Sequence, residues 1–304
     1  MRREEKPIDC LFIGGSTQDL MMRVEQMPGS DQRVQASEYV QCCGGVSATA
    51  AAAHQSLGGV TGMITIVGED EAGTFIRQDL AKQGFRAVQM IETSHSRSSV
   101  SMILVDRDGS RSITHYGGCI YDLEFEMLDK NLLKSAKVIH LGVMGEKLMV
   151  DIAKFCREEG EVLLSVDGGN LPRKLADQLL PYTDIWILDE ATAEKTLDLD
   201  AEEACRYYAS RGKQGMFTAV TRGEKGAVGF DGESFLYMES IDVPVVDTTG
   251  AGDNYHGAFL YALGQGWELK KCMEFAGVFA SLTCGQIGGR KGIPTLEEVI
   301  NRIA

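Results

Sequence analysis

The sequence feature that most constrains the fold is a regular alternation of strand-like and helix-like segments. Short apolar runs predict strands at residues 8–14, 62–67, 138–141, 162–166, 185–188, 217–221 and 227–230. Helical patterns predict helices at residues 46–57, 73–83, 146–158, 190–197, 202–211, 269–284 and 296–303. Because such alternation is typical of parallel strands joined by helical crossovers, the chain is predicted to form an α/β fold, a mostly parallel sheet covered by helices on both faces.

Two segments interrupt this alternation. Residues 33–42 alternate like a strand but have no helix after them, and residues 98–105 and 111–116 predict a hairpin closed by Asp106-Arg-Asp-Gly109. We therefore expect a small second sheet, built from about 33–42 and 98–116 and inserted into one domain that spans residues 1–304. The sequence shows no linker or repeat that would divide this domain.

Charge and composition disfavour several classes of partner. The chain has 44 acidic and 30 basic residues, a net charge of −14, which disfavours nucleic acid because duplex binding depends on neutralising phosphates. No apolar run reaches the roughly 18 residues of a membrane span. The charged N-terminus does not resemble a secretory signal, and the eight cysteines contain no Cys-x-x-Cys pair. We expect a cytoplasmic protein with reduced thiols.

A glycine-rich turn carries the strongest chemical signal. Asp247-Thr-Thr-Gly-Ala-Gly-Asp253 lies between a predicted strand at 241–246 and a predicted helix at 258–263. Bare backbone N–H groups at a helix N-terminus favour an anion, and Asp253 beside them is a candidate proton acceptor. These two functions are what phosphoryl transfer requires. A simple tight turn is the alternative reading. His256, three residues after Asp253, is either directed at the same site or structural.

Weaker candidates lie at the ends of other predicted elements. Asp19 follows the first strand, where ligands of open α/β sheets gather, although it could also be a turn or capping residue. Gly44 and Gly45 precede a small-residue helix, and Asp189 ends a strand. Neither a P-loop nor a dinucleotide-binding Gly-x-Gly-x-x-Gly fingerprint is present.

The glycine-rich turn, followed by Gly257-Ala258-Phe259-Leu260, resembles the C-terminal signature of the PfkB (ribokinase-like) carbohydrate kinases. The resemblance extends over residues 8–303. It implies a three-layer αβα ribokinase-like fold, whose small β-sheet is a lid over a sugar, and transfer of the γ-phosphoryl of ATP to a primary hydroxyl of that sugar. It further implies that Asp253 is the base, that Mg²⁺ bridges the ATP phosphates, and that the amides of Gly250, Ala251 and Gly252 stabilise the transferred group.

The resemblance also assigns binding positions, two of which depart from the family pattern. Thr49 stands where the family has an Asn that contacts the sugar, and Asp189 and Thr192 stand at the two ends of its Asn-x-x-Glu motif. The residues implied to bind the sugar are Asp19, Gly44, Gly45 and Thr49. The residues implied to lie along the nucleotide are Asp189, Thr221, Gly223, Gly226 and Gly288. Asp247 is the candidate ligand of a monovalent cation such as K⁺.

The sugar is predicted from two further similarities. Ala48-Thr49-Ala50-Ala51 and Gly288-Gly-Arg-Lys-Gly-Ile-Pro294 resemble the sulfofructose kinase and ketohexokinase branches, which favours a ketohexose or a derivative. A ribose or nucleoside kinase is the alternative, with Tyr39 and Tyr116 as candidates for a base pocket. A sugar sensor without catalysis is a third reading, motivated by the altered motif positions. The lid is the candidate surface for a homodimer.

Overall fold

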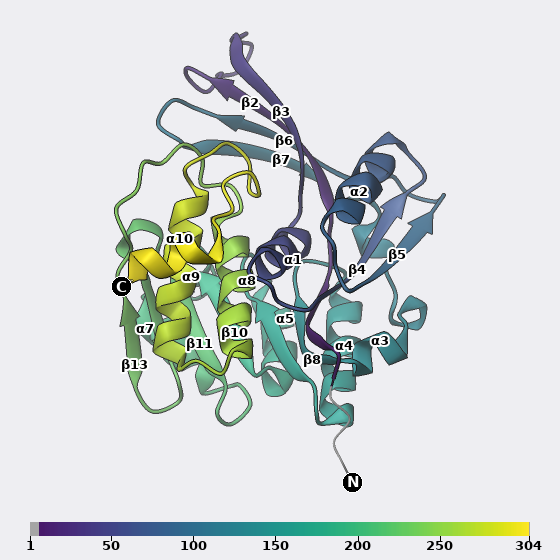
Figure 1. The fold of residues 1–304 in the computed structure, drawn as a ribbon, viewed down its shortest axis with the longest axis vertical. Helices are drawn as coiled ribbons and strands as arrows, with labels where there is room; N and C mark the ends of the chain where they lie inside the picture. Colours follow the sequence, from purple (N-terminus) through teal and green to yellow (C-terminus); the bar gives the residue numbers. More distant parts are fainter. Residues whose placement is uncertain (1–5, 304) are drawn as a thin grey trace.

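The computed structural model describes residues 6–303 and contains one large sheet (Figure 1). Its strands, in spatial order, are β13 (Phe235–Met238), β12 (Ala227–Phe230), β11 (Phe217–Thr221), β10 (Ile185–Asp189), β9 (Leu163–Asp167), β8 (Ala136–Leu141), β1 (Ile8–Ile13), β4 (Thr61–Gly68) and β5 (Ala87–Thr93). Every pair from β11 to β5 is parallel, whereas β12 and β13 form an antiparallel edge. This confirms the predicted mostly parallel sheet.

Helices cover both faces of this sheet, as predicted. One face carries α1 (Val46–Ser56), α2 (Glu71–Lys82), α8 (Ala251–Gly264), α9 (Leu269–Thr283) and α10 (Leu296–Ile303). The other carries α3 (Lys130–Lys134), α4 (Glu146–Glu159), α5 (Arg173–Leu179), α6 (Glu190–Leu197) and α7 (Ala201–Ala209). Short 3₁₀ segments are η1 (Gly118–Asp122), η2 (Phe125–Met127), η3 (Leu180–Tyr182) and η4 (Gly223–Lys225).

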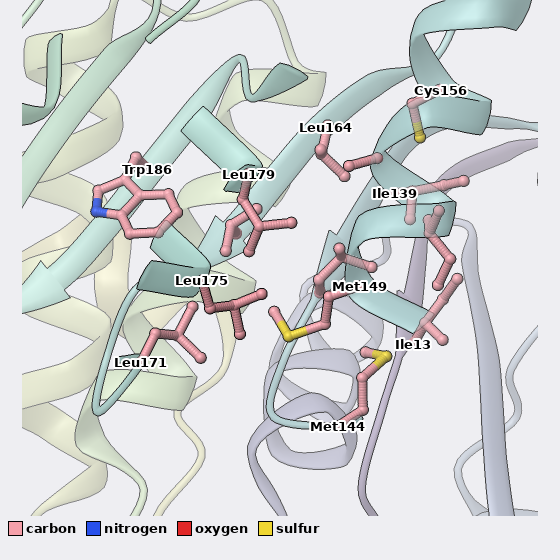
Figure 2. Close-up of a cluster of buried hydrophobic side chains, with 14 of the residues drawn as sticks. Ile13, Ile139, Met144, Met149, Cys156, Leu164, Leu171, Leu175, Leu179 and Trp186 are labelled. Carbon is pink, nitrogen blue, oxygen red and sulfur yellow. The ribbon is translucent and has the colours of Figure 1, made fainter. Parts of the chain in front are cut away.

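Each buried strand supplies both apolar layers, because successive side chains point to opposite faces. Leu11 of β1 belongs to the core on one face and Phe12 to the core on the other. Figure 2 shows the first of these cores, where Trp186 of β10 lies near Leu175 and Leu179 of α5. Trp186 is fully buried. Burying a large apolar side chain stabilises the fold by roughly 1.5–3 kcal/mol, so these two apolar layers hold the helices against the sheet.

A second, four-stranded sheet stands off the main body (Figure 1). Its order is β3 (Ala36–Gly44), β2 (Thr17–Val24), β6 (Ser99–Val105) and β7 (Arg111–Tyr116). The predicted hairpin is present as β6 and β7, and the predicted strand at 33–42 as β3. We call this small sheet the lid.

Several local predictions were wrong. Residues 241–246 form no strand, and Pro244 among them has no N–H to donate to a ladder. Strands β2, β5 and β13 were missed. Strand β2 starts only a few residues after β1 ends, and it contains Asp19. Asp19 therefore lies within a lid strand rather than in a turn or at a helix cap. The partners that make β2 a strand, β3 and β6, come from distant parts of the sequence.

Helix α8 packs closely on the alanine-rich α1. A Cβ placed on Gly257 would lie 2.2 Å from the carbonyl oxygen of Ala50 and 2.8 Å from the Cβ of Ala53. Only glycine permits this approach, because real Cβ atoms do not come that close to backbone. The packing fixes the position of the α8 N-terminus, which lies two helical turns before Gly257 and carries the glycine-rich turn.

We predict that Gly257→Ala destabilises the protein by about 1–3 kcal/mol, since overpacking at a close helix contact forces backbone shifts. Gly264→Ala is the matched control on the same helix, because a Cβ there meets nothing within 4 Å. The control should be neutral or stabilising by up to about 1 kcal/mol, the difference in helix propensity. Denaturant unfolding measures both, and equal stabilities for the two variants would contradict close α1–α8 packing.

Candidate active site

One large cavity lies between the lid and the carboxyl ends of the central strands. Its volume is about 1320 Å³. The lining runs from Thr17 and Asp19 on the lid, past Asp253, to Thr221 and Ser281 at the other end. Pockets for single small ligands are typically about 300–1,000 Å³, so the cavity has room for two ligands side by side.

The N-terminus of α8 forms the middle of the cavity wall. Gly250 is the N-cap, with a φ of 73°, and no side chain caps the helix. The first amides of a helix have no partner within it, so those of Gly252 and Asp253 are available to a ligand. A Cβ on Gly252 would meet nothing within 4 Å, which shows that the wall is open at this point. Gly250, Ala251, Gly252 and Asp253 all line the cavity, as the sequence predicted.

Asp253 is the carboxylate at this point of the wall. The pKa of Asp253 is raised from 3.8 to about 7, chiefly by burial and then by the neighbouring Asp167, while His256 opposes the shift. A carboxylate that titrates near neutrality is matched to accepting a proton from an alcohol during transfer. The structure therefore places a suitable general base beside free helix amides.

Asp247 ties the glycine-rich turn to the loop after α9. Its Oδ1 accepts hydrogen bonds from the N–H of Thr249 at 2.9 Å and from the hydroxyl of Thr249 at 2.7 Å. Its Oδ2 accepts from the N–H of Gly288 at 2.7 Å. Asp247 is 1% exposed, so these bonds replace water. Gly288 thus lies at this junction, and its neighbour Gly289 lines the cavity.

The predicted sugar-binding residues meet at the base of the lid. A Cβ on Gly44 would lie 1.9 Å from Oδ2 of Asp19, and one on Gly45 would lie 2.5 Å from the carbonyl oxygen of Gly15. Gly44 is therefore required for the close approach of the Asp19 side chain, and Gly45 for that of the Gly15 backbone. Burial raises the pKa of Asp19 to about 6, although a hydrogen bond with Ser101 works in the opposite direction.

Sequence reasoning missed the contacts of Arg290. Its Nε lies 3.5 Å from Oγ1 of Thr49, its Nη2 donates to the carbonyl of Gly44 at 3.1 Å, and its Nη1 pairs with Asp79 at 2.8 Å. Arg290 thus supports Thr49, which stands in the position of the family's Asn. The motif Gly288-Gly-Arg-Lys was noticed in the sequence, but nothing local indicates that its Arg reaches α1 and α2.

Four predicted nucleotide-binding residues line the opposite end of the cavity: Asp189, Thr221, Gly223 and Gly226. Asp189 caps α6, because its carboxylate accepts from the N–H of Thr192 at 2.8 Å and from its hydroxyl at 2.7 Å. Glu190 pairs with Lys225 at 3.1 Å. Asp189 and Glu190 thus already have partners within the chain.

Asp167 was also missed. It ends β9 and lines the cavity near Asp253, and His256 lies 3.5 Å from it. The signal was available, because a carboxylate that ends a parallel strand lies at the edge where ligands bind. His256 was singled out by its spacing from Asp253, and the structure places it in this cluster.

Comparisons with known proteins agree with this geometry. The family described as pfkB family carbohydrate kinase matches residues 8–296. The ribokinase of Lactococcus lactis is 27% identical over 292 residues, covering 94% of both chains, and a nucleoside kinase of Methanothermobacter thermautotrophicus is 22% identical over 302 residues, covering 97% of this chain and 95% of its own.

A solved structure shares the fold along nearly the whole chain. The structure of Arabidopsis thaliana ribokinase complexed with ribose and ATP superposes with a TM-score of 0.83 at 23% identity, covering 97% of this chain and 98% of that one. The lid and the central sheet belong to this common architecture. With the family match spanning most of the sequence, the chain belongs to the pfkB family of carbohydrate kinases and is a kinase.

Proposed function

We propose that this protein transfers the γ-phosphoryl group of ATP to a primary hydroxyl of a small sugar. The observation that carries the proposal is the placement of Asp253 beside the free amides at the N-terminus of α8, on the wall of a cavity large enough for both substrates. Asp253 accepts the proton of the sugar hydroxyl. The amides of Gly250, Gly252 and Asp253 stabilise charge on the phosphoryl group in transit, whereas the N–H of Ala251 already donates to the carbonyl of Thr248 at 3.2 Å.

The nucleotide would occupy the end of the cavity formed by Thr221, Gly223 and Gly226. Positive φ angles at Gly223 and Gly226 let the β11–β12 connection turn tightly, and a Cβ on Gly226 would lie 1.9 Å from the carbonyl of Met238. The same cavity is lined by the α8 N-terminus and by Thr249 and Ser281. ATP bound here points its phosphates at the helix.

Mg²⁺ fits this site chiefly through water. Asp189 already accepts two hydrogen bonds from Thr192, and Glu190 is paired with Lys225. Mg²⁺ tolerates a mostly hydrated shell, held by substrate phosphates and one or two carboxylates. When bound, the ion would neutralise phosphate charge, and Asp189 would hold one of its waters.

K⁺ beside Asp247 stays a prediction. Both oxygens of Asp247 accept hydrogen bonds that join two loops, which gives the residue a structural function without a cation. Oδ1 already accepts two hydrogen bonds and Oδ2 one, so Oδ2 retains a lone pair for an ion.

The sugar would bind between Asp19, Gly44, Gly45 and Thr49, under the lid. Arg111 of β7 donates a hydrogen bond to the Thr248 hydroxyl, which joins the lid to the glycine-rich turn. Both residues line the cavity. A lid held in this way excludes water from the reacting groups. A homodimer through the lid stays a prediction.

The preferred sugar is a ketohexose or a derivative of it, on the strength of the two motif similarities. A ribose or nucleoside acceptor is the second candidate. The relatives named ribokinase and nucleoside kinase favour it, and so does an apolar patch of Ile103, Ile113 and Tyr121 on the cavity wall. Tyr39 and Tyr116, the earlier candidates for a base pocket, are absent from the described lining. Family membership and the suitably placed base argue against a sensor without catalysis.

We predict that Asp253→Asn retains the fold and ATP binding but lowers kcat by roughly 10²–10⁴-fold, the usual contribution of a general base. Asp242→Asn, an exposed carboxylate on the same cavity wall, is the matched control and should keep kcat within a factor of a few. A coupled ADP assay measures both. Retention of more than about a third of kcat by Asp253→Asn would exclude Asp253 as the base.

Gly252→Val should obstruct the anion site and lower kcat without weakening sugar binding, because the amides act on charge that develops in the transition state. A Cβ here meets no protein atom within 4 Å, so the fold should tolerate the added side chain. Gly252→Ala should show a smaller loss. Calorimetric titration with the sugar tests the point, and weakened sugar binding equal to the loss of kcat would instead indicate general disruption.

A substrate panel tests the acceptor. Purified enzyme with ATP and Mg²⁺ should show its highest kcat/KM on a ketohexose or ketohexose derivative among ketoses, aldoses, sugar acids, ribose and adenosine. A value for ribose or adenosine more than about tenfold above every ketose and sugar acid, a difference of about 1.4 kcal/mol in transition-state binding, would overturn the ketohexose assignment.

A further inference from the structure

Two buried side chains beside Asp253 have no role in the reaction as described so far. Asp167 lies at the carboxyl end of β9, and His256 lies on α8, one turn after Asp253. Nε2 of His256 is 3.5 Å from Oδ1 of Asp167. The residues are only 9% and 4% exposed, and both line the cavity with Asp253.

The surroundings fix the charge that each partner carries. The Gly169 N–H donates to Oδ1 of Asp167 at 2.8 Å, and His256 adds the opposite charge, so the pKa of Asp167 is lowered although burial alone would raise it. Burial alone would lower the pKa of His256, but Asp167 and Asp253 together raise it. The pKa of each partner is thus moved toward its charged form, a carboxylate for Asp167 and an imidazolium for His256.

The second histidine behind this pair remains neutral. His140 of β8 lies with its ring centroid 5.0 Å from that of His256, and its Nδ1 is 2.9 Å from the hydroxyl of Ser165. Burial, followed by the proximity of His256, lowers the pKa of His140 to about 3. Asp19 and Arg290 are the other charged groups that act on Asp253, and they act with opposite sign. His256 thus contacts Asp167 and lies one helical turn from Asp253.

We propose that His256, paired with Asp167, is a positioning residue for phosphoryl transfer: its imidazolium offsets the Asp167 carboxylate and so keeps Asp253 ionised and able to accept the proton of the sugar hydroxyl. The inference rests on the proposed function, because it assigns Asp253 as the base. His256 does not touch the reacting atoms in this account. It acts only through the charge that it supplies.

Removing His256 alone should leave the Asp167 charge acting on Asp253 without the cation that offsets it. A nearby like charge disfavours ionisation and so raises the pKa of a carboxyl group. In His256→Asn the acidic limb of kcat/KM against pH should therefore move upward by about one unit or more, with little loss on the alkaline plateau. At a pH one unit below the midpoint of the shifted limb, kcat/KM of the variant should be about tenfold below its alkaline plateau.

The double variant Asp167→Asn/His256→Asn gives the discriminating result. Removing the Asp167 charge as well should return the limb toward or below its original pH, because no neighbouring anion then opposes ionisation of Asp253. A structural role for the pair predicts the opposite, namely losses that add or worsen in the double variant. His54→Asn is the matched control, since His54 is a buried neutral histidine on α1, bonded to Thr61, and should leave the limb in place.

Three outcomes would overturn the inference: an unchanged limb in His256→Asn, no reversal in the double variant, or a neutral His256 at pH 7 in the NMR spectrum of the wild-type ring nitrogens. The NMR measurement needs no variant, so it decides the question even if His256→Asn fails to fold. Activity retained by Asp253→Asn would instead refute the base assignment. Loss of activity in that variant, together with an unshifted limb in His256→Asn, would refute only the role of His256.

Discussion

The active site depends on the position of one helix end. In the proposed function, the amides of Gly250, Gly252 and Asp253 stabilise a phosphoryl group only if the N-terminus of α8 is held rigidly at the cavity wall. Two contacts hold it: the close packing at Gly257 against α1, and the buried Asp247 carboxylate that joins Thr249 to Gly288. Each contact excludes water, so breaking either one would cost free energy.

Burial and charge in the same cavity then decide what the carboxylates can do. Asp19 and Asp253 both have raised pKa values because they are withdrawn from water, whereas Asp167 retains its charge beside His256. Arg290 adds a cation behind Thr49. An overall charge of −14 therefore says little about the cavity, where a few fixed cations set the local balance.

The sequence predicted what depends on local pattern and missed what depends on distant partners. The alternation of strand-like and helix-like segments predicted the parallel sheet. The glycine-rich turn predicted Asp253 and the amides beside it as candidate site groups. Strand β2 was missed because its partners β3 and β6 lie elsewhere in the chain. The same reason applies to Arg290, which meets Thr49 and Asp79 across more than 200 residues of sequence. Proline in residues 241–246 was the local signal that should have excluded a strand there.

The central claim is that one cavity brings ATP and sugar to the two sides of Asp253. The most direct test is a crystal structure with a non-hydrolysable ATP analogue and the sugar that turns over. The account predicts the terminal phosphoryl group within hydrogen-bonding distance of the Gly252 and Asp253 amides, and a sugar hydroxyl on the Asp253 carboxylate. Phosphates bound away from the α8 N-terminus, or a sugar hydroxyl out of reach of Asp253, would contradict it.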